Sequence, residues 1–201
     1  MKRKKKTNIV LEAKIINVVA AALTTVAGIM LLVLKEPVAY QKWMFGALFL
    51  VIGISKLIGY FSNDLYRLAF QFGLSMGIFA SVIGMLILIS PEKMSTAIPV
   101  VLGAYVILDG ALKIQTAWDA KKFGMSKWVI LLISSVCVCL LGIGAEIGLN
   151  EEKLFDPQLL LAVALMALGG MNAFFTAYTV RVRAKKKNIT DKYDLSLDKN
   201  D

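Results

Sequence analysis

Long apolar runs dominate the chain, and short polar segments separate them. The runs lie at about residues 15–34, 43–61, 68–90, 97–118, 128–148 and 158–180. Each run is close to the roughly 20 residues that a helix needs to cross about 30 Å of hydrocarbon. The runs are apolar on nearly all sides and lack the polar face of a helix at an aqueous surface. The pattern therefore predicts an all-α membrane protein with six transmembrane helices.

A short phrase recurs near the end of every second run. In each copy a small residue is followed by a glycine seven positions later and by a polar residue three positions after that. The copies are Gly46, Gly53 and Lys56, then Gly103, Gly110 and Lys113, then Ala162, Gly169 and Asn172. They lie 57 and 59 residues apart, which predicts three tandem helical-hairpin repeats at residues 15–61, 68–118 and 128–180. A two-helix repeat keeps its orientation in the membrane, so we expect a pseudo-threefold arrangement.

Composition and charge agree with a membrane protein and suggest its orientation. Hydrophobic residues make up 58% of the chain, and the net charge is +9. Lysine and arginine gather in an N-terminal segment at residues 1–14, in the loop between the fourth and fifth runs, and in a tail at residues 181–201 that we expect to be disordered. This bias predicts cytoplasmic termini that attract anionic lipid headgroups. Aromatic residues do not interleave with the basic runs, so nucleic-acid binding is not expected.

The residue types present argue against several kinds of chemistry. The chain has no histidine, which excludes His-dependent triads and most zinc sites. Cys137 and Cys139 point in nearly opposite directions on a helix, which disfavours a disulfide or a metal pair. The loops are short and carry no cluster of acids or nucleophile with base. We therefore expect no catalytic residues, no cofactor and no metal.

Small residues at spacings of four or seven predict where the helices approach one another closely. The glycines assigned to helix packing are Gly28, Gly46, Gly53, Gly73, Gly77, Gly84, Gly103, Gly110 and Gly169. Prolines mark the turns between runs. Ser90-Pro91 predicts the end of the third helix, and Asp156-Pro157 predicts a capped start of the sixth.

Asp109 is the acid predicted to lie deepest in the membrane. At 1.5 Å per residue it lies roughly 13 Å from the helix end at Trp118, too far for its carboxylate to reach water. Lys113 is four residues further on the same helix face, so a local ion pair is the structural interpretation. The functional alternative is a proton-linked or cation-linked role for Asp109. Glu146 lies near the external end of its helix and is interpreted as an interfacial acid.

Lys56, Lys113 and Asn172 occupy equivalent places in the three copies. The structural interpretation is that the two lysines anchor their helices by extending toward the interface. The alternative is a ring of polar groups at one depth, which could bind an anion or a lipid headgroup. Together with Asp109 these residues form the candidate intramembrane polar site.

Two stretches carry a resemblance to a known family. Gly28-Ile-Met-Leu-Leu, Pro37, Gly46 and Gly53-Ile-Ser-Lys56 in the first copy correspond to Gly84-Met-Leu-Ile-Leu, Pro91, Gly103 and Gly110-Ala-Leu-Lys113 in the second. This register resembles the short hairpin repeat of the HdeD family of bacterial acid-resistance membrane proteins. The resemblance implies a bacterial inner-membrane protein without known catalytic residues, linked in some members to survival in acid. The third copy departs from the pattern, with Asn172 where the others have lysine.

The sequence is consistent with two functions. One is a non-enzymatic plasma-membrane protein that contributes to acid or envelope stress resistance. The other is a small proton-linked or ion-linked transporter or channel that uses Asp109. A membrane enzyme is the weakest alternative because the loops are short. The sequence leaves homo-oligomerisation open.

Overall fold

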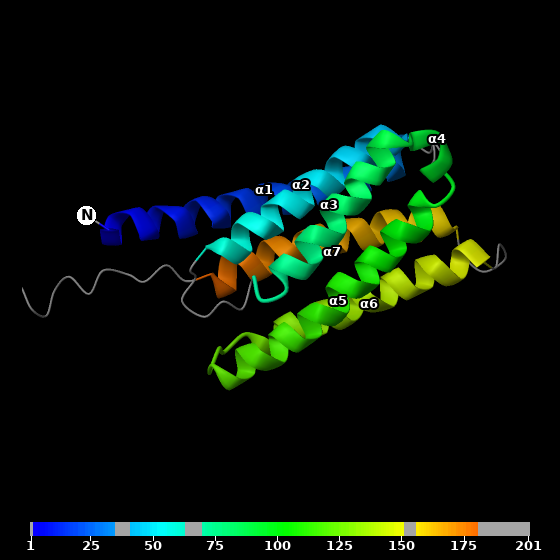
Figure 1. Ribbon diagram of the computed structural model, residues 1–201. Helices are drawn as coiled ribbons and strands as arrows, with labels where there is room; N and C mark the ends of the chain where they lie inside the picture. Colours follow the sequence, from blue (N-terminus) through cyan, green and yellow to red (C-terminus); the bar gives the residue numbers. More distant parts are fainter. Residues whose placement is uncertain (1, 35–40, 63–69, 151–155, 181–201) are drawn as a thin grey trace, which may run out of the picture.

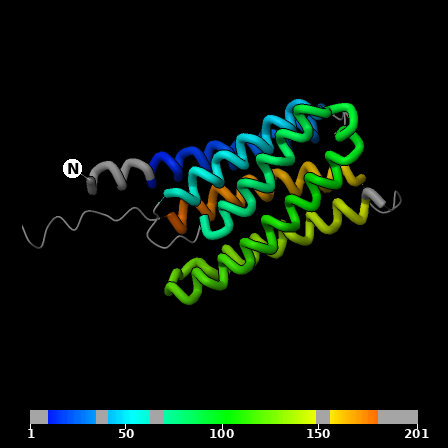
Figure 2. The backbone as a smooth tube through the Cα atoms, in the orientation of Figure 1, coloured from blue at the N-terminus to red at the C-terminus, as the bar shows by residue number. Residues whose placement is uncertain are grey.

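Long helices lie side by side in the computed structural model of this protein (Figure 1). The structure describes residues 2–34, 41–62, 70–150 and 156–180, and this part of the chain contains helices and no strand. The helices are α1 (Lys2–Leu34), α2 (Lys42–Phe61), α3 (Gly73–Ile89), α4 (Pro91–Met94), α5 (Ile98–Lys122), α6 (Trp128–Asn150) and α7 (Pro157–Thr179). The start of α1 lies at the same end of the bundle as the end of α7 (Figure 1), and α4 lies at the opposite end (Figures 1 and 2). The all-α prediction is confirmed.

Local sequence explains several helix ends. The Asp156 side chain accepts a hydrogen bond from the Gln158 backbone N–H at 3.0 Å, and Pro157 occupies the first turn, as predicted. α3 ends at Ile89, just before Ser90-Pro91, which is also as predicted. α5 ends in a turn that needs a glycine: Gly124 has a φ of 70°, a backbone conformation that side chains with a Cβ rarely adopt. This turn returns the chain directly into α6.

In the described part of the chain, five helices are long and apolar enough to cross a membrane, namely α1 from residue 10 onward, α2, α5, α6 and α7. α3 is apolar but has only 17 residues, about 25 Å of helix. It is shorter than the predicted run at 68–90 because residues 70–72 form a turn. α1 begins at Lys2, so it includes basic residues that were expected to precede the helix. Lipid explains large exposed side chains such as Ile89 and Leu140, which are 74% and 62% exposed.

Three antiparallel helix pairs make the closest contacts: α2 with α3, α5 with α6, and α7 with α1. A glycine of the recurring phrase lies in each contact. A Cβ on Gly53 would lie 2.6 Å from the Ser81 backbone nitrogen of α3, and one on Gly110 would lie 3.2 Å from the Cys139 nitrogen of α6. A Cβ on Gly169 would lie 2.6 Å from the Ala21 carbonyl oxygen of α1. Glycine is needed at these positions because backbone approaches backbone.

The helices α2, α5 and α7 supply most of the buried side chains at the centre of the bundle. Each buries residues at the same spacing of three and four positions, which places them on one helix face. The buried positions are Phe45, Leu48, Phe49 and Ile52 in α2, Leu102, Tyr105, Val106 and Asp109 in α5, and Leu161, Ala164, Leu165 and Leu168 in α7. Asp109 is the one charged residue among these twelve.

Candidate intramembrane polar site

Asp109 accepts hydrogen bonds from two neighbouring helices. Its Oδ1 atom lies 2.6 Å from Nζ of Lys56 on α2, and its Oδ2 atom lies 2.9 Å from Nδ2 of Asn172 on α7. Asp109 itself is only 2% exposed. Both carboxylate oxygens are therefore bound, and one side chain joins α2, α5 and α7. We call Asp109, Lys56, Asn172 and Lys113 the central polar cluster.

Lys113 does not form the predicted ion pair with Asp109. Its ammonium group lies 5.0 Å from the centre of the Phe175 ring, and it belongs to no ion pair among the described residues. Lys56, Lys113 and Asn172 occupy equivalent positions on their helices, and helical side chains lean toward the N-terminus, here toward Asp109. The two residues that reach across from other helices occupy both carboxylate oxygens. The ammonium group of Lys113 therefore packs against the face of the Phe175 ring.

The prediction that Lys56 extends toward the interface is also wrong. Its side chain is 14% exposed, and its ammonium group is bound to the buried carboxylate of Asp109. A carboxylate and an ammonium that are both removed from water lose much hydration free energy, which their mutual attraction offsets when the geometry is good. Removing either partner would leave the other charge buried and uncompensated. The pair therefore links α2 and α5 at the centre of the bundle.

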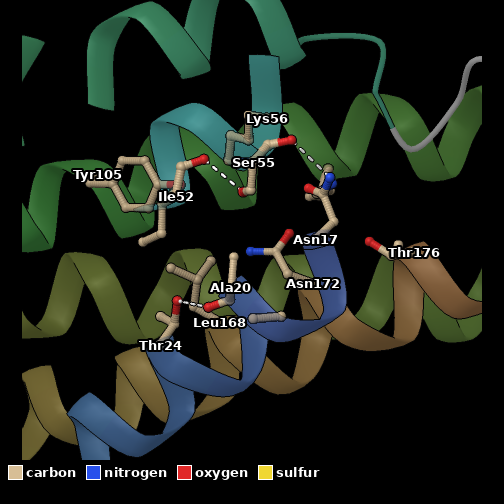
Figure 3. A pocket seen from close by; sticks show the side chains of 12 residues that line it. Asn17, Ala20, Thr24, Ile52, Ser55, Lys56, Tyr105, Leu168, Asn172 and Thr176 are labelled. Carbon is tan, nitrogen blue, oxygen red and sulfur yellow. Dashed lines mark hydrogen bonds between the residues drawn. The ribbon is translucent and has the colours of Figure 1, made fainter. Parts of the chain in front are cut away.

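A small cavity lies beside the central polar cluster, between α1, α2, α5 and α7 (Figure 3). Its volume is about 20 Å³, enough for one water molecule or an ion of similar size. Its lining residues are Asn17, Ala20, Ala21, Thr24, Ile52, Ser55, Lys56, Tyr105, Lys113, Leu168, Asn172 and Thr176. More than half of them are polar or charged, in contrast to the rest of the interior.

Asn17 is the polar residue that α1 contributes to this region, and sequence reasoning did not assign it to the site. Its Nδ2 atom donates to the Ala13 carbonyl at 3.0 Å and to the Ser55 carbonyl of α2 at 2.9 Å. Figure 3 shows its amide between Ser55 and Asn172. Tyr105 and Thr176 were missed as well, and only their helical spacing from Asp109 and Asn172 could have suggested them.

The remaining predicted residues lie outside the central polar cluster. Glu146 is partly buried, and its side chain packs against Gly103 of α5. Cys137 and Cys139 are free thiols, and the backbone of Cys139 packs against Gly110. Among the described residues no three acids, cysteines or histidines gather as a metal site would require. The predicted tail at 181–201 and the basic side chains of residues 2–6 lie outside the described side chains.

The family comparison identifies a repeat in the chain. The model of a short repeat of unknown function (DUF308), which describes the HdeD-like group, matches residues 19–89 and again residues 75–145. The two matches begin 56 residues apart and together run from residue 19 to residue 145, well over half of the 201 residues. No curated protein and no solved structure matches the chain.

Proposed function

Because the chain belongs to the family of the short repeat of unknown function (DUF308), we propose that it is a non-enzymatic protein of the bacterial plasma membrane that contributes to acid or envelope stress resistance. The likeness to the HdeD-like group supports the physiological part of this proposal. Connections as short as residues 123–127 leave little room for a catalytic domain, which supports the non-enzymatic part. The bilayer is the expected partner, with anionic headgroups at the basic termini.

We propose six crossings in three hairpin repeats, with α3 as the sixth crossing. The support is the threefold recurrence of one helix contact: the second helix of each proposed repeat packs on the first helix of the next, and α7 returns to α1. The buried positions of α2, α5 and α7 recur at the same repeat intervals. A short helix such as α3 can be accommodated by local thinning of the bilayer at modest cost.

We propose that the end of the bundle carrying the start of α1 faces the cytoplasm. Lys121, Lys122 and Lys127 lie at the connection between α5 and α6, at this same end. Lys14 of α1 donates to the Ala177 carbonyl of α7 at 3.0 Å and therefore lies at this end as well. An excess of lysine and arginine on one side supports this orientation.

The main support for a bundle-stabilising role of Asp109 is that both of its carboxylate oxygens accept hydrogen bonds from neighbouring helices. A carboxylate that is fully bound within the bundle joins helices, whereas a transporting carboxylate exchanges its partners for water or an ion during a cycle. We therefore propose that the central polar cluster holds the helices of the bundle together. In this proposal it stabilises a membrane protein that the cell needs under acid stress.

The test of the physiological role is a deletion strain of the bacterium that encodes this chain. We expect lower survival after an acid challenge and recovery when wild-type protein is restored. Equal survival with and without the protein, under both acid and envelope stress, would contradict the proposal. Complementation with Asp109→Asn at normal membrane levels separates the roles of this residue, because unchanged survival would rule out a titrating function.

The second candidate function is a small proton-linked or ion-linked transporter or channel, and the polar cavity beside Lys56 and Lys113 favours it. Flux into proteoliposomes, measured with an internal pH dye and an imposed potential, discriminates the two. The bundle-stabilising proposal expects no flux above that of empty liposomes. Flux in the wild type that disappears in Asp109→Asn would establish the transporter instead.

A further inference from the structure

The central polar cluster contains more positive than negative charge. Lys56 and Lys113 contribute two ammonium groups, whereas Asp109 contributes one carboxylate, already bound to Lys56 and Asn172. Lys113 is only 7% exposed, and in the described part of the chain it makes no hydrogen bond or ion pair. A buried ammonium group without an anion is costly in a low-dielectric interior. The Phe175 ring offsets part of this cost and supplies no negative charge.

No carboxylate of the described helices lines the cavity that contains Lys113. Asp119 lies near the end of α5, where it binds Lys122 at 3.2 Å and Gln71 at 3.3 Å. Glu146 packs against Gly103, nearly three helical turns from Lys113 along α5. Neither acid lines the cavity that contains Lys113. Asp109 attracts Lys113 as well as Lys56, but one carboxylate does not balance two ammonium groups, so the central polar cluster keeps a net positive charge.

The cavity brings a second donor to the same space. Thr176 lines it together with Lys113, is 5% exposed, and its hydroxyl makes no hydrogen bond within the described residues. An ammonium group has only donors to offer, and a threonine hydroxyl can donate as well. A cavity of about 20 Å³ has room for a single small ion.

We propose that this cavity is a binding site for a small monovalent anion of halide size, with Lys113 as its cationic ligand and Thr176 as a hydroxyl donor. Such an anion balances the surplus charge beside Asp109 and satisfies two buried donors at once. The site goes beyond the proposed function, which assigns no ligand to the bundle, and it does not depend on transport.

The test is chloride binding to the full-length protein in nanodiscs of zwitterionic lipid. Sodium chloride replaces sodium gluconate at constant ionic strength, and the chloride NMR line width reports binding. We expect saturable broadening with the wild type. Lys113→Met should weaken binding at least about tenfold, because a charge-assisted contact to a buried ion is lost. Thr176→Val should weaken it by a smaller factor, about threefold to tenfold, because one neutral donor is lost.

Lys121→Met is the matched control, since it removes the same charge at an exposed position against Trp118. Its chloride affinity should equal that of the wild type. No saturable binding by the wild type, or equal affinity in wild type and Lys113→Met, overturns the proposal. If circular dichroism shows that Lys113→Met does not fold, the chloride affinity of Thr176→Val is the test instead. An affinity equal to that of the wild type would then overturn the proposed site. Flux is measured separately, so failure here leaves the physiological proposal standing.

Discussion

Gly169→Ala is the most direct perturbation of the contact between the last and first helices. The added methyl group would lie 2.6 Å from the Ala21 carbonyl oxygen and 2.7 Å from the Thr25 backbone nitrogen. Both distances are well inside 3.0 Å, below which such contacts essentially do not occur. The atoms met are backbone atoms, so relief requires α1 and α7 to move apart along their shared surface.

The magnitude follows from two opposing terms. Overpacking of a close contact costs about 1–3 kcal/mol, and here the upper half of the range applies because backbone atoms cannot rotate away. Alanine gains about 1 kcal/mol over glycine in a helix. We therefore expect Gly169→Ala to lower the free energy of unfolding by about 1–2 kcal/mol. Gly110→Ala should cost less, because its added methyl group would meet Cys139 at a longer 3.2 Å.

Gly170→Ala provides a matched control on the next residue of the same helix. Nothing lies within 4 Å of a Cβ built on Gly170, so only the helix term applies and the protein should gain about 0.5–1 kcal/mol. The assay is reversible unfolding of the purified protein in mixed micelles, followed by circular dichroism. If Gly169→Ala and Gly170→Ala changed the free energy of unfolding equally, the reasoning would be refuted. The close approach of α7 to α1 would then not contribute to stability.

Two further predictions concern side chains that join or begin helices. Asp109→Asn should lower the free energy of unfolding by about 3 kcal/mol because it leaves Lys56 buried without its anion, and adding Lys56→Met should recover more than half of that loss. A double variant that unfolds as readily as the sum of the two single variants would argue against their coupling. Asp156→Ala should cost about 1 kcal/mol in the same assay, because it removes the acceptor of the Gln158 N–H at the start of α7. A variant as stable as the wild type would show that solvent replaces this cap.

Sequence patterns anticipated the helices well, because helix formation in lipid depends on local properties. Apolar runs of about 20 residues leave few alternatives to a helix, and Asp156-Pro157 marks the start of α7 through its own hydrogen bond. The start of α3 was misplaced because Phe70 and Phe72, on either side of Gln71, continue the apolar run through the turn at residues 70–72. Hydropathy alone does not separate the two.

The sequence alone did not predict which residues of the central polar cluster bind Asp109. A spacing of four residues places Lys113 and Asp109 on one helix face, and this spacing predicted an ion pair between them. The actual partner, Lys56, lies 53 residues earlier in the chain. Which of two equivalent lysines reaches the carboxylate depends on the relative position of three helices. The equivalence of Lys56, Lys113 and Asn172 placed them at one depth, but it did not determine their partners.

The contact between α1 and α7 has a consequence for biosynthesis. α1 is made well before α7, so the surface formed by Ala21, Thr25 and Gly28 meets its partner only when α7, the last of the described helices, has been made. A chain that ends before α7 therefore lacks the partner of this α1 surface, and its first helix is left without its main packing contact.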